Sequence, residues 1–203
     1  MAKFSTPFLT LMALSGASLS GHAALPPQFS ECLTGDSAAL SSYDVHDIAK
    51  VAKVTYCQNQ MGITNKTETL TMLKNKNIQI GISIAKTSYS REDLLELARA
   101  GSYALYVDSN RIAKEYLPEI AKAGAQLIII SSTSGLAATD LRTLVQQGKP
   151  FVYNVNSNAT KEDLKSLVSL GVEVVIRSSQ VGLSKEDIME IARVNTDSVT
   201  ILP

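Results

Sequence analysis

The stretch SREDLLELARAGSYALYV, residues 90–107, contains the pattern from which the fold is predicted. Leu94 and Leu97 are three residues apart, the spacing of the buried face of a short helix. Gly101 follows four residues later, where a helix commonly ends in a left-handed cap. Residues 103–107 are then apolar and rich in strand-forming side chains. The stretch therefore predicts a helix that is followed directly by a strand.

The same pattern recurs along the chain. Its first apolar position repeats every 23 or 24 residues, at Leu70, Leu94, Leu117, Leu141, Leu164 and Ile188. The second apolar position follows three residues later, at Leu73, Leu97, Ile120, Leu144, Leu167 and Ile191. The cap position comes next, at Asn77, Gly101, Gly124, Gly148, Gly171 and Asn195. The predicted strands are residues 78–84, 103–107, 127–130, 151–155, 174–176 and 199–202. Helix starts show a hydroxyl residue followed three positions later by Asp, at Ser90, Thr160 and Ser184. This regularity predicts tandem βα repeats and an all-parallel sheet.

A weaker copy of the repeat lies upstream. Val45, Ile48 and Ala52 reproduce the helix pattern, and a strand is expected over residues 54–57. Cys32 lies 25 residues before Cys57, so a strand over residues 28–33 would place the two cysteines on neighbouring strands. Adjacent strands are about 4.8 Å apart, within the reach of a disulfide. The repeat thus predicts a Cys32–Cys57 disulfide and about eight strands.

The strands are apolar on both sides. Positions in each strand are counted from the Gly or Asn cap. Positions three and five are expected to face the helices, and position four is expected to face the opposite side. Position four is occupied by Gly81, Leu105, Ile128, Val152, Val175 and Val199. Sheets that are apolar on both faces are covered on both faces. A closed or nearly closed barrel with the helices outside is therefore preferred over an open solenoid or an open doubly wound sheet. Residues 47 apart also match, as Tyr106 does with Tyr153, which suggests a module of two βα units.

Residues 41–203 resemble leucine-rich repeats, chiefly the shorter and cysteine-containing kinds, in the spacing of Leu and Gly. That resemblance implies an open horseshoe whose concave face is wet. The chain departs from the family because no consistent asparagine column follows the strands, and because the position opposite the helices is apolar rather than polar. The solenoid accordingly stays the alternative.

The first 23 residues have the features of a signal peptide. Lys3 precedes an apolar stretch over residues 8–19, and Ala23 ends a small-residue site where cleavage is expected. The protein is therefore expected in the periplasm or outside the cell, with no membrane insertion after cleavage. Residues 24–203 are expected to form one domain, in which 24–60 are degenerate, disulfide-bearing repeats and 61–203 are regular ones.

Composition restricts the chemistry. The chain of 203 residues has 19 basic and 19 acidic side chains, a balance that argues against a nucleic-acid partner. Loss of residues 1–23 leaves His46 as the sole histidine, and only two cysteines occur. No metal site, cofactor or histidine-based catalytic device is expected from this inventory.

Polar residues gather after the predicted strands, where parallel βα proteins bind ligands. The candidate binding residues are Lys86, Asp108, Ser132, Asn156, Arg177 and Ser179. Because catalytic side chains are scarce, the sequence predicts a non-catalytic module with a binding or structural role, and its expected partner is a protein. The alternative is a barrel-type enzyme or a binder of a small sugar or anion at these polar loops.

Overall fold

The computed structural model describes residue 32 and residues 40–58 and 65–202. The helices are α2 (Ser42–Ile48), α3 (Lys66–Leu73), α4 (Arg91–Ala100), α5 (Leu117–Ala123), α6 (Ala138–Gln147), α7 (Lys161–Ser169) and α8 (Lys185–Val194). The strands are β1 (Val54–Gln58), β2 (Ile78–Ser83), β3 (Ala104–Val107), β4 (Gln126–Ile130), β5 (Val152–Val155), β6 (Glu173–Arg177) and β7 (Val199–Leu202). Short 3-10 turns, η1 (Lys114–Tyr116) and η2 (Thr196–Ser198), precede α5 and β7. The elements alternate as the repeat predicts, and each strand lies within two residues of its predicted bounds.

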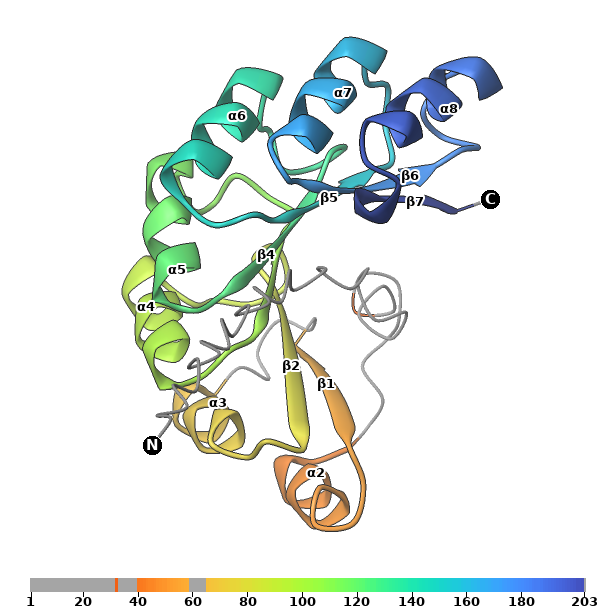
Figure 1. Cartoon of the computed structure of the whole chain (residues 1–203). Helices are drawn as coiled ribbons and strands as arrows, with labels where there is room; N and C mark the ends of the chain where they lie inside the picture. The colour runs from red at the N-terminus through yellow and green to blue at the C-terminus, as the bar shows by residue number, and fades with distance from the viewer. Residues whose placement is uncertain (1–31, 33–39, 59–64, 203) are drawn as a thin grey trace, which may run out of the picture.

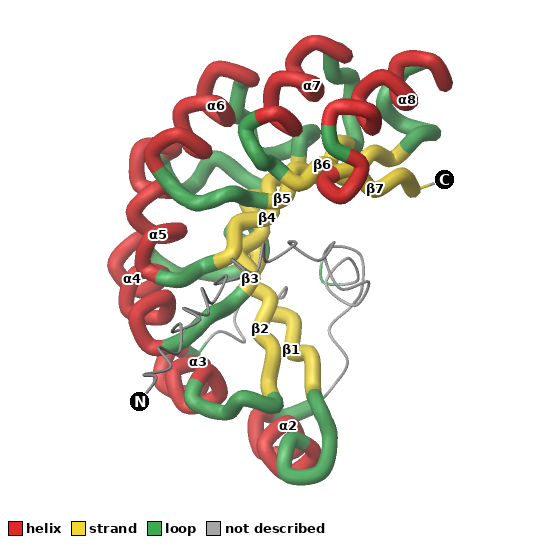
Figure 2. The backbone as a smooth tube through the Cα atoms, in the orientation of Figure 1, coloured by secondary structure: helices red, strands yellow, loops and turns green. Residues whose placement is uncertain are grey.

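The seven strands form one parallel sheet in the order of the sequence. Figures 1 and 2 show that this sheet bends into an arc, with the helices along its outer, convex side. Among the described residues, β1 and β7 each pair on one side only and form the two ends of the arc. The predicted all-parallel α/β sheet with outer helices is confirmed. The eighth strand expected over residues 28–33 falls, apart from Cys32, outside the described residues.

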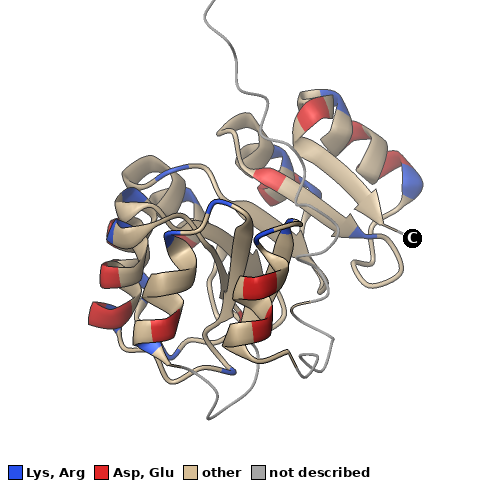
Figure 3. Ribbon diagram, turned by 90° about the horizontal axis from the view of Figure 1, so that it is seen from below, with Lys and Arg blue, Asp and Glu red and all other residues tan. Residues whose placement is uncertain are grey.

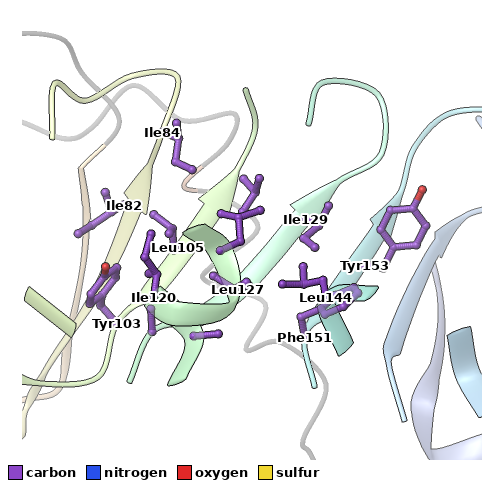
Figure 4. Close-up of a cluster of buried hydrophobic side chains, with 14 of the residues drawn as sticks. Ile82, Ile84, Tyr103, Leu105, Ile120, Leu127, Ile129, Leu144, Phe151 and Tyr153 are labelled. Carbon is purple, nitrogen blue, oxygen red and sulfur yellow. The ribbon is translucent and has the colours of Figure 1, made fainter. Parts of the chain in front are cut away.

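The main core lies between the sheet and the helices. Alternate strand residues, such as Ile82, Leu105, Leu127 and Ile129, point toward the helices and are almost fully buried (Figure 4). The predicted helix positions meet them, because Leu94, Leu97, Ile120, Leu141, Leu144, Leu164, Leu167 and Ile191 are all buried in the same cluster. Burial of this apolar surface is the main force that holds each helix against the sheet.

A second, smaller core lines the concave face. It contains Ala104, Tyr106, Ile128, Ile130, Val152, Val175 and the buried Cys32. Both faces of the sheet are therefore apolar, as predicted. Two predicted face assignments are wrong: Leu105 and Val199 pack on the helix side, and in β3 the concave residues are Ala104 and Tyr106. Tyr106 and Tyr153, which the 47-residue spacing pairs, lie on opposite faces, since Tyr106 aligns with Val152 across β4.

The predicted N-caps are confirmed. The hydroxyl groups of Ser90, Thr160 and Ser184 accept hydrogen bonds from the backbone N–H three residues on. The predicted left-handed glycine caps are confirmed only at Gly124 and Gly171, which have φ of 139° and 84°. Gly101 and Gly148 end their helices in extended conformations instead. A Cβ atom on Gly101 would lie 2.9 Å from the Leu73 carbonyl oxygen, so close approach of the backbone explains this glycine.

The predicted disulfide is confirmed. Cys32 and Cys57 are bonded, with their Cα atoms 5.2 Å apart. Cys32 lies in a turn rather than in a strand, and it packs against the concave face of the sheet. Within the described ranges, every helix is too short or too polar to cross a membrane.

Candidate functional site

The concave face of the arc carries a few polar side chains among its apolar ones. The strand register places Tyr106, Ile128, Val152 and Glu173 in one row across β3 to β6. Two residues further along the strands, Ile130, Asn154 and Val175 form the next row. Because alternate strand residues share a face, these rows place Tyr106, Asn154 and Glu173 on the same side of the sheet.

These three polar side chains are buried in an otherwise apolar surface. Tyr106 is 1%, Asn154 7% and Glu173 6% exposed. The Tyr106 hydroxyl and the Asn154 Oδ1 atom make no hydrogen bond within the described part of the chain. Buried polar atoms without partners are rare in folded proteins and call for an explanation. Burial also raises the pKa of Tyr106 far above its ordinary range, so its hydroxyl stays protonated and can donate.

Asp108 lies just beyond Tyr106, at the edge of this face. Its Oδ2 atom accepts a hydrogen bond of 2.5 Å from the Ser83 hydroxyl, and its Oδ1 atom accepts one of 2.8 Å from the Ala85 N–H. The Ser83 hydroxyl also accepts a bond of 3.0 Å from the Lys86 N–H. Asp108 therefore orders the turn after β2, whereas the Lys86 side chain is exposed.

A second polar group joins the turns after β4 and β5. The Ser131 hydroxyl lies 3.0 Å from Asn156 Oδ1 and 2.8 Å from the Ser157 hydroxyl. Asn156 Oδ1 also accepts a bond of 3.1 Å from the Ser132 N–H. These groups satisfy one another, so their main effect is to hold the two turns together. A groove of about 360 Å³ opens on the helix side of this group, between α6 and α7.

The remaining predicted residues lie further along the same edge. Arg177 ends β6, is half-buried and aligns with Leu202 of β7. Ser179 is exposed in the following turn. The structure thus brings Asp108, Asn156 and Arg177 to the carboxyl edge of one sheet, while the side chains of Lys86, Ser132 and Ser179 are exposed.

The buried trio Tyr106, Asn154 and Glu173 was not predicted as a site. Each is a polar residue inside a short apolar strand, and that interruption is the signal that could have marked it. His46, by contrast, lies in the last turn of α2, next to the amino end of β1. Within the described residues, no group of three or more His, Cys, Asp or Glu side chains could hold a metal ion.

No protein-family model matches the chain, and none of the curated proteins compared with it matches. Solved structures do match. One is a double mutant of flavocytochrome b2 with pyruvate bound, at 20% identity and a TM-score of 0.40, covering 74% of this chain and 49% of that one. Another is flavocytochrome b2 with sulfite bound, at 21% identity and a TM-score of 0.39, covering 68% and 45%. The chain thus spans about half the length of these structures or less.

This comparison corrects the main functional prediction from the sequence. The matched structures are of flavocytochrome b2, and neither is described as a non-catalytic module that binds a protein partner. The alternative prediction was a barrel-type enzyme or a binder of a small sugar or anion at the polar loops after the strands. Of these we carry forward the small-ligand binder, but on the concave face rather than at those loops.

Proposed function

We propose that the protein binds a small, neutral molecule with hydroxyl or amide groups on the concave face of the sheet. The observation that supports this most directly is that two polar atoms on this face, the Tyr106 hydroxyl and Asn154 Oδ1, are buried without partners among the described residues. Both are more than nine-tenths buried, and neither has a hydrogen-bond partner in the described ranges. A ligand that supplies those partners would remove the cost of leaving them unpaired.

The chemistry of the Tyr106 hydroxyl and Asn154 Oδ1 suits a neutral ligand. The Tyr106 phenol donates, because its pKa is raised by burial, and the amide oxygen of Asn154 accepts. The two groups come from β3 and β5 with β4 between them, so separate hydroxyl or amide groups of one ligand would accept from the first and donate to the second. Ligand sites of this kind are largely apolar, with a few placed polar groups.

Thermal-shift measurements and calorimetry test the proposal. The panel contains neutral monosaccharides and disaccharides, small carboxamides, and phosphate and sulfate as anions. We expect a saturable shift with a neutral polar compound and loss of that binding in the Tyr106→Phe variant, which removes a single hydroxyl group. The matched control is Tyr103→Phe, because the Tyr103 hydroxyl donates to the Leu94 carbonyl at 2.8 Å on the helix side.

The two variants also differ in expected stability. Tyr103→Phe should lower the free energy of unfolding by about 1 kcal/mol, since it breaks a hydrogen bond and leaves a buried carbonyl with one partner fewer. Tyr106→Phe should leave it unchanged or raise it. Equal destabilisation of both variants would show that the Tyr106 hydroxyl is already paired in the folded protein. That result, or silence across the neutral panel, would contradict the proposal.

We also propose that the chain is exported to the periplasm or secreted. The support is the signal-like pattern of residues 1–23 and the disulfide between Cys32 and Cys57, since disulfides persist in oxidising compartments. N-terminal sequencing of the protein recovered from its native cells tests this proposal. A mature chain that begins at Ala24 supports export, whereas an intact Met1 in a reduced protein contradicts it.

A further inference from the structure

Consecutive helices are joined by ion pairs with a recurring geometry. Lys66, the first residue of α3, lies 2.9 Å from Asp93 Oδ1 and 2.9 Å from Glu96 Oε2, at the third and sixth positions of α4. The equivalent trio of Lys161 with Asp187 and Glu190 joins α7 to α8, at 3.0 and 3.2 Å. Figure 3 shows that the charged residues lie mainly on the outer helices. A lysine held between two carboxylates is therefore a repeated way of docking one helix on the next.

Each end of the arc carries one half of this arrangement. Lys185 is the first residue of α8 and is exposed, and no described helix follows α8 along the sheet. At the other end, Asp44 and Asp47 occupy the third and sixth positions of α2, and both are exposed. Asp47 pairs only with Lys50 of the same segment among the described residues, at 73% side-chain exposure. The cation of one end matches the two carboxylates of the other.

Both ends also expose apolar side chains. Met189, Val194 and Ile201 are 42%, 38% and 43% exposed at the α8–β7 end. Tyr43, Ile48 and Val51 are 80%, 38% and 89% exposed at the α2–β1 end. Figure 1 shows these ends as the two extremities of the arc, and within the described ranges β7 and β1 each pair with one strand only. Exposed apolar groups beside an open strand edge favour association.

Met189 has a buried counterpart in another repeat. It occupies the fifth position of α8, and the fifth residue of α4 is Leu95. Leu95 is only 6% exposed and belongs to the main core, in a helix that packs against α5. Met189 therefore has the position that Leu95 occupies in α4, where the side chain is buried.

We propose that the protein self-associates head to tail, with the α8–β7 end of one copy docked on the α2–β1 end of a second copy. Lys185 then lies between Asp44 and Asp47 of the second copy, as Lys161 does between its two carboxylates in α8. The second α2 takes the position relative to α8 that α8 takes relative to α7, and its β1 extends the parallel sheet beyond β7. A second copy is the occupant because the two ends complement each other in charge and in repeat position. Such heterologous contacts build rings or filaments.

Analytical ultracentrifugation of the full chain over a wide concentration range measures this association. We expect a wild-type protein larger than one chain. Lys185→Glu and Asp47→Lys should each weaken association about tenfold or more, because each places like charges together. The double variant should restore it, since the pair is then reversed. Asp47 is the better choice because the Asp44 carboxylate caps α2 through Ser41.

Lys122→Glu is the matched control, because Lys122 is exposed on α5, away from both ends, and undergoes the same change of charge. It should associate as the wild type does. Circular dichroism of each variant confirms that the fold is retained. A wild-type protein that stays monomeric at every concentration overturns the proposal. So does an assembly whose strength the two single reversals leave unchanged, or one that the double variant fails to restore.

Discussion

The Asp140 carboxylate accepts a hydrogen bond of 3.0 Å from the Ala137 N–H at the start of α6. In α4 and α8 a second, reciprocal hydrogen bond is present. There the Ser90 and Ser184 hydroxyls accept from the backbone N–H of Asp93 and Asp187. Ala137 has no hydroxyl, so α6 has only half of a capping box. Its backbone angles, φ −81° and ψ 164°, nevertheless match those of Ser90, at −75° and 170°. The conformation of a capped helix is therefore present without the cap.

The Ala137→Ser variant should stabilise the protein. The new hydroxyl can accept the Asp140 N–H without any change of backbone, and an N-cap serine contributes about 1 kcal/mol relative to alanine. Urea denaturation measures the gain in the free energy of unfolding. The reverse change, Ser184→Ala, should lower it by a similar amount. Loss of stability in Ala137→Ser would show that the start of α6 differs from those of α4 and α8.

Acid should destabilise the protein through the aspartates at helix starts. The pKa values of Asp44, Asp93, Asp140 and Asp187 all lie below the ordinary value of 3.8. A lysine ammonium is the main cause for Asp93 and Asp140, and the N-cap hydroxyl is the main cause for Asp44 and Asp187. These carboxyl groups bind protons less tightly in the folded chain than in the unfolded chain. The stability that they contribute is therefore complete above the unfolded pKa and is lost as pH falls from there through the folded pKa.

Urea midpoints measured between pH 7 and pH 2.5 check this expectation, and we expect the decline to begin near pH 4. Asp140→Asn is the informative variant, because its amide oxygen can still accept the Ala137 N–H but does not titrate. Its stability should be lower than that of the wild type at pH 7 and should depend less on pH below 4. An equal pH dependence in both proteins would exclude a contribution from Asp140.

The helix and strand pattern could be predicted because each repeat carries its own signals. Leu94 and Leu97 form a buried helix face at a spacing that strands do not share, and Ser90 with Asp93 marks the helix start. The facing of β3 could not be predicted in the same way. Its residues are apolar on both sides, so no alternation distinguishes Leu105 from its neighbours Ala104 and Tyr106.

The candidate site was harder to predict than the fold. Tyr106, Asn154 and Glu173 come from three different strands, and only the pairing register shows that they share a face. The loop residues were visible because polar side chains follow every strand. The structure shows that Asn156 and Ser131 largely satisfy each other, which a list of polar residues cannot reveal.

Truncation of the repeated core should be costly. Leu141 lies on the buried face of α6 and is 1% exposed, so Leu141→Ala should lower the free energy of unfolding by about 2 to 5 kcal/mol through lost burial and a residual cavity. Val51→Ala is the contrasting variant, because Val51 is 89% exposed, and its effect should stay within about 0.5 kcal/mol. Guanidinium denaturation compares the two. A cost below about 1 kcal/mol for Leu141→Ala would mean that α6 is not firmly docked.

The disulfide should stabilise the fold by joining a distant residue to the first described strand. Its cysteines are 25 residues apart, and the bond holds the buried Cys32 against the concave face beside β1. A Cys32→Ser/Cys57→Ser variant should lose about 2 to 4 kcal/mol of unfolding free energy, mainly because its unfolded chain is less restricted. Thiol titration of the denatured, unreduced wild type should find no free thiol, whereas Cys32→Ser alone should expose one. Two titratable thiols in the wild type would contradict the bond, and an unchanged stability in the double variant would show that the bond does not restrict the unfolded chain enough to stabilise the fold.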